Sequence, residues 1–142
     1  MPLLTRWAIR AAMIYLLVGL IAGALYWLNN AWSFWKPFVA LNPVYIHLIV
    51  VGWLTQLIYG VMYWMFPIIS RSNMRGDTYQ AWAALIALNI GLILRALAEP
   101  WLTLAPNAIN QTALIASAIF QVAAGYLIVL VCWPRVREKP GK

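Results

Sequence analysis

Four apolar stretches, each long enough to form a membrane-spanning helix, constrain this chain more than any other feature of its sequence. They fall at residues 7–28, 43–66, 78–98 and 108–133. A helix needs roughly 20 mainly apolar residues to cross the hydrocarbon core of a bilayer. Of the 142 residues, 65% are hydrophobic and only 9% are charged, a balance typical of membrane proteins. The sequence therefore predicts an all-α integral membrane protein, a single domain built as a four-helix transmembrane bundle.

The distribution of basic residues predicts the topology. The net charge is +7, and eight of the ten lysine and arginine residues lie in the N-terminal arm, the second loop or the C-terminal tail. Four spans place these three segments on one side of the membrane, whereas Lys36 and Arg95 lie towards the other. This asymmetry follows the positive-inside rule, so we expect both termini in the cytoplasm and the protein in the cell inner membrane. The basic tail is then placed to contact anionic lipids, and we expect no nucleic-acid partner.

The second stretch contains His47, which is the only histidine of the chain. In the predicted topology its helix begins at the outer side, so the imidazole lies about one turn inside the outer boundary. An imidazole at this depth is a metal ligand, a proton carrier or a hydrogen-bonded polar residue. Gly52 and Gly60 lie near one face of the same helix and leave a groove for something flat or for another backbone.

Arg95 lies in the third stretch at nearly the depth of His47, four residues before Glu99. One interpretation is an arginine that reaches towards the outer headgroups with Glu99 as its partner. The other is a guanidinium that binds the carboxylates of a ligand, for which its forked geometry is well suited.

Two further patterns predict contacts between helices. Gly19 and Gly23 have the GxxxG spacing that allows another helix to approach closely. Three amide side chains fall near the middle of the membrane, where we expect hydrogen bonds between helices or, as an alternative, a quinone or proton route: Gln56, Asn89 and Gln121.

Residue counts exclude several chemistries. The single cysteine, Cys132, cannot form an internal disulfide, and the chain lacks the CxxC and CxxCH motifs. We therefore expect neither an iron–sulfur cluster nor a covalently attached c-type haem on this chain alone. Only three acidic residues are present, which leaves few proton carriers for a transporter.

The segment YIHLIVVGWLTQLIYGVMYWMFP resembles the histidine-bearing helix of the catalytic subunits of haem–copper oxidases and nitric-oxide reductases. More closely, it resembles the pattern HxHLxxxGWxxxxxxGxxYxxFP of small four-helix relatives. The matching residues are His47, Leu48, Gly52, Trp53, Gly60, Tyr63, Phe66 and Pro67. The resemblance implies that His47 is an axial ligand of a b-type haem in the outer half of the membrane. Gly52 and Gly60 would then lie beside the haem, and Arg95 near its propionates.

Two departures from the pattern limit what the resemblance implies. Tyr45 replaces the first histidine of the HxH pair, and no histidine lies on any other helix. A copper site and an oxygen-reducing haem need several more histidines, so we do not expect this chain alone to be an oxidase. Met62 and Met65 follow His47 by 15 and 18 residues, roughly 22–27 Å along a helix, and cannot bind the same iron.

The ligand set leaves two alternatives for haem b. The iron is five-coordinate, or two copies of His47 bind one haem at a subunit interface. A homodimer is favoured for the shared site, a trimer is conceivable, and a larger respiratory complex can supply another subunit. The expected role is electron transfer or haem and gas sensing. The alternatives are a haem-free structural or accessory subunit of a respiratory membrane complex, and a zinc or copper site made from copies of His47.

Overall fold

The structure is a computed structural model that describes residues 1–33, 35–69 and 75–136. Its described residues form four helical stretches that are long and apolar enough to cross a membrane, which confirms the predicted all-α four-helix class of a multi-pass membrane protein. The first is α1 (Leu3–Trp32), and the last two are α4 (Thr78–Leu104) and α5 (Ala108–Cys132). The second stretch is continuous but changes its helix type along its length.

Four segments make up this second stretch. It begins with a 3₁₀-helix, η1 (Lys36–Ala40), and continues as α2 (Leu41–His47). A π-helix, η2 (Leu48–Thr55), comes next, followed by α3 (Gln56–Met65). A short 3₁₀-helix after α5, η3 (Trp133–Arg135), completes the described elements.

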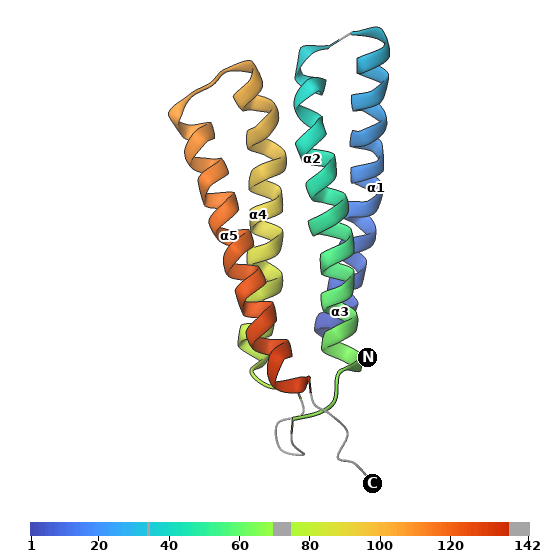
Figure 1. The fold of residues 1–142 in the computed structure, drawn as a ribbon, viewed down its shortest axis with the longest axis vertical. Helices are drawn as coiled ribbons and strands as arrows, with labels where there is room; N and C mark the ends of the chain where they lie inside the picture. Colours follow the sequence, from blue (N-terminus) through green and yellow to red (C-terminus); the bar gives the residue numbers. More distant parts are fainter. Residues whose placement is uncertain (34, 70–74, 137–142) are drawn as a thin grey trace.

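The helices form two antiparallel hairpins that lie side by side (Figure 1). In one hairpin α1 packs along α2, η2 and α3, and in the other α4 packs along α5. The hairpins meet mainly through α4, which also contacts η1, α2 and η2. The start of α1 and the end of α5 lie at the same end of the bundle, which we call the terminal end; the opposite end is the distal end (Figure 1).

Residues at the helix ends account for their boundaries. Asp77 caps the start of α4, where its carboxylate accepts a hydrogen bond from the backbone N–H of Tyr79 at 2.8 Å. Asn107 caps α5 in the same way through the N–H of Asn110 at 2.8 Å. Helix α4 extends to Leu104, six residues beyond the predicted end at 98. Pro100 is tolerated there because it removes only one hydrogen bond close to the end of the helix.

The predicted GxxxG contact is formed within the chain. A methyl group at Gly19 would lie 2.8 Å from Ile49 Cδ1, and one at Gly23 would lie 3.4 Å from the Tyr45 ring. Both glycines are buried, so α1 approaches α2 and η2 closely along this face. The spacing therefore stabilises the first hairpin.

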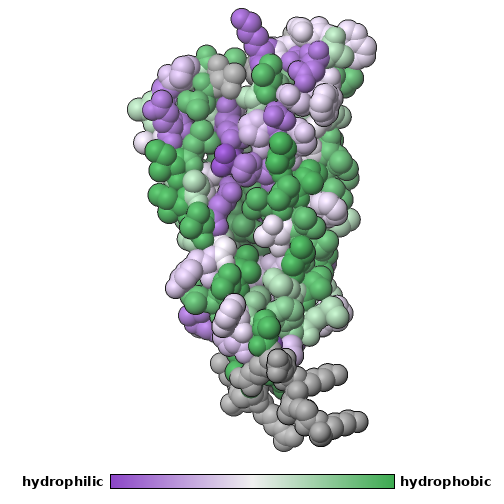
Figure 2. All heavy atoms as spheres, viewed as in Figure 1, coloured by the Kyte–Doolittle hydropathy of each residue, from purple (hydrophilic) through white to green (hydrophobic). Residues whose placement is uncertain are grey.

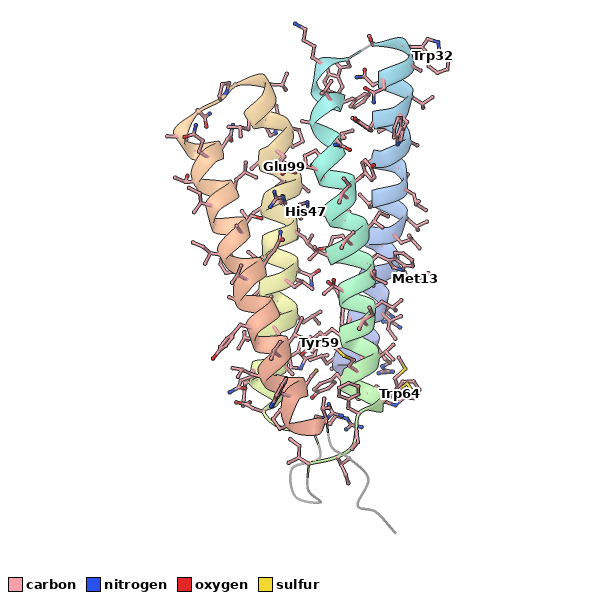
Figure 3. The ribbon with its side chains drawn as sticks, viewed as in Figure 1. Met13, Trp32, His47, Tyr59, Trp64 and Glu99 are labelled. Carbon is pink, nitrogen blue, oxygen red and sulfur yellow. The ribbon has the colours of Figure 1, made fainter. Side chains whose placement is uncertain are left out.

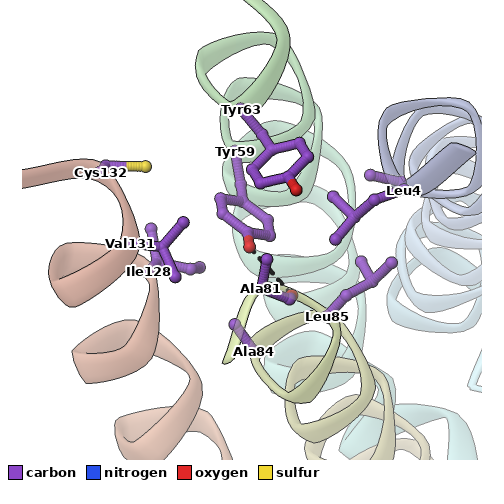
Figure 4. Packing of buried hydrophobic residues seen from close by; sticks show 10 residues of the cluster. Leu4, Tyr59, Tyr63, Ala81, Ala84, Leu85, Ile128, Val131 and Cys132 are labelled. Atoms are coloured by element: carbon purple, nitrogen blue, oxygen red, sulfur yellow. Dashed lines mark hydrogen bonds between the residues drawn. The ribbon is translucent and has the colours of Figure 1, made fainter. Parts of the chain in front are cut away.

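A hydrophobic core at the terminal end joins all four spans (Figure 4). Leu4 of α1, Leu85 of α4 and Ile128 of α5 surround Tyr59 of α3. The Tyr59 hydroxyl donates a hydrogen bond to the carbonyl of Ala81 at 2.9 Å, which connects the two hairpins. This end of the bundle is therefore fixed by packing and by a hydrogen bond.

Arg135 closes the same end from the second hairpin. Its side chain is only 1% exposed and donates hydrogen bonds to the carbonyls of Tyr63, Phe66 and Pro67 at 3.0, 2.7 and 3.1 Å. The last carbonyls of a helix have no partner within the helix, and a cation is favoured at that end. Arg135, which the sequence interpretation counted only as a topological charge, therefore caps α3.

Candidate functional site

His47 is the last residue of α2 and is half-buried. Its Nδ1 lies 2.8 Å from the carbonyl oxygen of Pro43, one turn earlier. A carbonyl oxygen can only accept a hydrogen bond, so Nδ1 must carry the proton in this contact. The lone pair of the neutral imidazole is then on Nε2, the arrangement in which protein histidines bind metals.

The π-helix η2 begins directly after His47. Within it, the hydroxyl of Thr55 donates a hydrogen bond to the carbonyl of Val50 at 2.8 Å, which spans the five-residue step of a π-helix. Such segments are rare and occur frequently at functional sites. This change of helix type could not be predicted from the sequence, because the residues of η2 are ordinary apolar helix residues apart from Gly52 and Thr55.

Arg95 and Glu99 form the predicted ion pair on α4. Arg95 Nε lies 3.0 Å from Glu99 Oε1, and their side chains are 23% and 10% exposed. This pairing agrees with the first of the two interpretations of Arg95. It leaves the second open, because the ion pair uses Nε and a guanidinium has four further N–H donors on its terminal nitrogens.

His47 and Glu99 lie at neighbouring heights on facing hairpins (Figure 3), and α4 contacts both α2 and η2. Hydrophilic side chains gather in this part of the surface, surrounded by apolar ones (Figure 2). We call the three partly exposed residues His47, Arg95 and Glu99 the polar strip. Exposing polar side chains to lipid is energetically unfavourable. Contact of the polar strip with a ligand or a protein partner is therefore favoured over contact with lipid.

Gly52 and Gly60 do not belong to the polar strip. A methyl group at Gly52 would lie 2.8 Å from Tyr15 Cγ, and one at Gly60 would lie 3.0 Å from the side chain of Ala8. Helix α1 therefore fills the space beside both glycines. The ring of Tyr15 packs at Gly52, and the side chain of Ala8 with the carbonyl oxygen of Thr5 packs at Gly60. These contacts give no support to the predicted place of the glycines beside a cofactor.

The mid-membrane amides form a hydrogen-bonded network across three spans. Asn89 Nδ2 donates to Gln56 Oε1 at 3.2 Å, and the hydroxyl of Tyr15 donates to Asn89 Oδ1 at 2.8 Å. Gln56, which is fully buried, also donates to the carbonyl of Ala8 at 3.4 Å. The predicted hydrogen bonds between helices are thus confirmed for Gln56 and Asn89. Tyr15 was missed because its partner, Asn89, lies 74 residues away in the chain, so no sequence spacing indicates the contact.

Gln121 takes a different role from the other two amides. Its Nε2 donates to the hydroxyl of Ser117 on its own helix at 3.2 Å. Ser117 is the residue that connects the helices, because its hydroxyl donates to the carbonyl of Gly91 at 2.7 Å. Serine and glycine at this contact let α4 and α5 approach closely.

The described residues supply one imidazole and no enclosed metal site. His47 provides a single nitrogen donor, and the described residues contain no group of three or more histidine, cysteine, aspartate or glutamate side chains able to enclose a metal ion. The fold and the site thus define a four-helix, multi-pass membrane protein with one half-buried imidazole. Comparison with protein-family models, curated proteins and solved structures gives no match to this chain.

Proposed function

We propose that this protein binds haem b through His47 and serves electron transfer or haem and gas sensing. The observation that carries this proposal is the hydrogen bond from His47 Nδ1 to the Pro43 carbonyl at 2.8 Å. It orients the ring and leaves Nε2 as the iron ligand, on a residue of the polar strip. The resemblance of the His47 helix to that of haem–copper oxidases supports the same assignment.

The surrounding residues would orient the cofactor. Arg95 is held by Glu99 at 3.0 Å, and its remaining N–H donors suit the propionate carboxylates of a haem. When bound, the haem supplies the redox chemistry, and the protein sets its orientation and local charge. We do not propose oxygen reduction, since the chain has no further histidine for a copper site.

The single histidine favours a haem shared between chains. A haem with two histidine ligands needs a second imidazole, and a second copy of this chain provides one across a two-fold axis normal to the membrane. The polar strip would be covered in such a homodimer. A trimer or a partner subunit in a larger respiratory complex would satisfy the same requirement. The charge asymmetry supports insertion in the cell inner membrane with both termini in the cytoplasm.

The second candidate is a haem-free structural or accessory subunit of a respiratory membrane complex. Two observations favour it: α1 fills the faces of Gly52 and Gly60, and Glu99 already pairs with Arg95. In that case a protein partner covers the polar strip. Zinc or copper bound between copies of His47 is a third alternative that elemental analysis of the purified protein detects.

Absorbance spectroscopy of the purified protein separates these candidates. We expect a Soret band with resolved α and β bands on reduction, and we expect His47→Ala to lose them. Ile21→Ala, an exposed apolar change on α1, is the matched control and should keep the spectrum. A haem-to-chain ratio of about one half indicates the shared site. A high-spin spectrum with one haem per chain indicates five-coordinate iron and contradicts sharing. A colourless protein obtained at full expression with added haem would refute haem binding.

A further inference from the structure

A groove between α1 and α4 lies towards the terminal end, away from the polar strip. Its volume is about 340 Å³. Trp7 and Ala11 line it from α1, and residues from Trp82 to Ile93 line it from α4. It opens on the membrane-facing surface, because Trp7 is 54% exposed and Ile93 is 52% exposed.

The length of the groove matches one leaflet of a bilayer. Trp82 and Ile93 are eleven residues apart on α4, which corresponds to about 16 Å of helix. The hydrocarbon core of a bilayer is about 30 Å thick, so the groove extends from one interface to about the middle. The two tryptophans lie at its interfacial end, where amphipathic rings are favoured.

The residues that line the groove are mainly apolar, so they provide hydrophobic contacts and few hydrogen bonds. Asn89 is the only amide among its lining residues. Its polar atoms are engaged with Tyr15, Gln56 and the carbonyl of Leu85, at 2.8, 3.2 and 2.7 Å. Apart from the indole N–H groups of Trp7 and Trp82 at the interfacial end, a polar head such as a quinone ring therefore finds no ready partner inside, whereas an acyl chain needs none.

Positive charge flanks the interfacial end. Arg6 and Arg10 are exposed on α1 and are the direct sequence neighbours of Trp7 and Ala11. Long basic side chains at the end of a span extend towards the headgroup layer, where they attract anionic lipids. Arg10 also lies three residues after Trp7, so these two side chains are neighbours on the helix surface at the interfacial end of the groove.

We propose that this groove binds an anionic phospholipid from the leaflet on the side of the terminal end. One acyl chain lies in the groove between Trp7 and Ile93, and the phosphate of the headgroup binds Arg6 and Arg10. This site is independent of His47, so a haem-free protein binds the lipid equally well.

Native mass spectrometry in detergent tests the proposal with an equimolar mixture of phosphatidylglycerol and phosphatidylcholine that carry the same acyl chains. We expect the first bound lipid to be phosphatidylglycerol in clear excess. The two guanidinium groups supply the positive charge that favours an anionic headgroup, so Arg6→Gln with Arg10→Gln should remove most of this preference. These exposed substitutions leave the packing of the bundle intact.

A second variant tests the groove itself. Ala11→Phe fills the groove and should lower retention of the lipid, whereas Ala118→Phe changes a groove on α5 of about 510 Å³ and should not. Circular dichroism confirms that each variant is folded. Equal retention of both lipids by the unchanged protein, or an unchanged preference in the double arginine variant, would overturn the proposal. So would loss of binding with Ala118→Phe, or the finding that Ala11→Phe abolishes a dimer seated on this face.

Discussion

Replacing Asn89 by leucine tests the network that connects the histidine-bearing span to α4. The change removes the hydrogen bonds to Gln56 at 3.2 Å and from Tyr15 at 2.8 Å. Hydrogen bonds between membrane helices contribute about 0.6 kcal/mol on average and up to about 1.7. Gln56 is 0% exposed, so its carbonyl oxygen also loses a partner that water cannot replace. We expect Asn89→Leu to lower the free energy of unfolding by about 1–3 kcal/mol.

A double-mutant cycle isolates the contact between the two amides. Gln56→Leu combined with Asn89→Leu removes both partners together, so the double variant should be more stable than the sum of the single changes predicts, by about 0.6–1.7 kcal/mol. Titration of mixed micelles with a denaturing detergent, followed by circular dichroism, gives the free energies. Gln121→Leu is the matched control and should lower the free energy of unfolding less, because among the described residues the amide of Gln121 bonds to Ser117 on its own helix. Strict additivity of the two leucine substitutions would refute the proposed coupling.

Three further stability predictions use the same unfolding assay. Arg135→Met should lower the free energy of unfolding by about 2–4 kcal/mol, because one buried and two partly buried carbonyls lose a charged donor. Arg135→Lys should lower it less. Equal stability of Arg135→Met and the unchanged protein would contradict the capping role. Gly91→Ala should cost about 1–3 kcal/mol, since the new methyl group would lie 3.0 Å from the Ser117 carbonyl oxygen. A methyl group at Gly125 would have no neighbour within 4 Å, so Gly125→Ala should not destabilise the protein. A similar loss of stability in Gly91→Ala and Gly125→Ala would exclude close helix approach as the cause. Asp77→Ala should cost about 0.5–2 kcal/mol by removing the cap of α4, and Asp77→Asn should retain most of the stability.

Hydropathy predicted the spans because the length of a membrane helix is set by the thickness of the bilayer. Each of the four predicted ranges overlaps a helical stretch of the structure, and the second passes the end of its stretch by one residue, at Phe66. The third predicted range ends at residue 98, before Glu99 and Pro100, whereas α4 continues to Leu104. A proline in the last turns removes too little hydrogen bonding to end a helix that is already formed.

The candidate site was only partly accessible to prediction. His47 and the pair of Arg95 with Glu99 follow from residue type, depth and the i,i+4 spacing, which are local properties of the sequence. The partners of the glycines are not local, because they depend on which helix lies beside Gly52 and Gly60. The three carbonyls bound by Arg135 lie 68 to 72 residues away in the chain, so no sequence spacing indicates them.

The stabilising contacts and the candidate haem site occupy different parts of the bundle. The hydrogen bonds of Tyr59 and Arg135 lie at the terminal end, and that of Asn89 lies near the middle. His47 lies towards the distal end, and the hydrogen bond that orients its ring is made within its own helix. Removing the imidazole therefore leaves the contacts between the hairpins in place. Loss of haem from a folded His47→Ala protein would then report on ligation, whereas an Asn89 variant would lose stability with His47 still present.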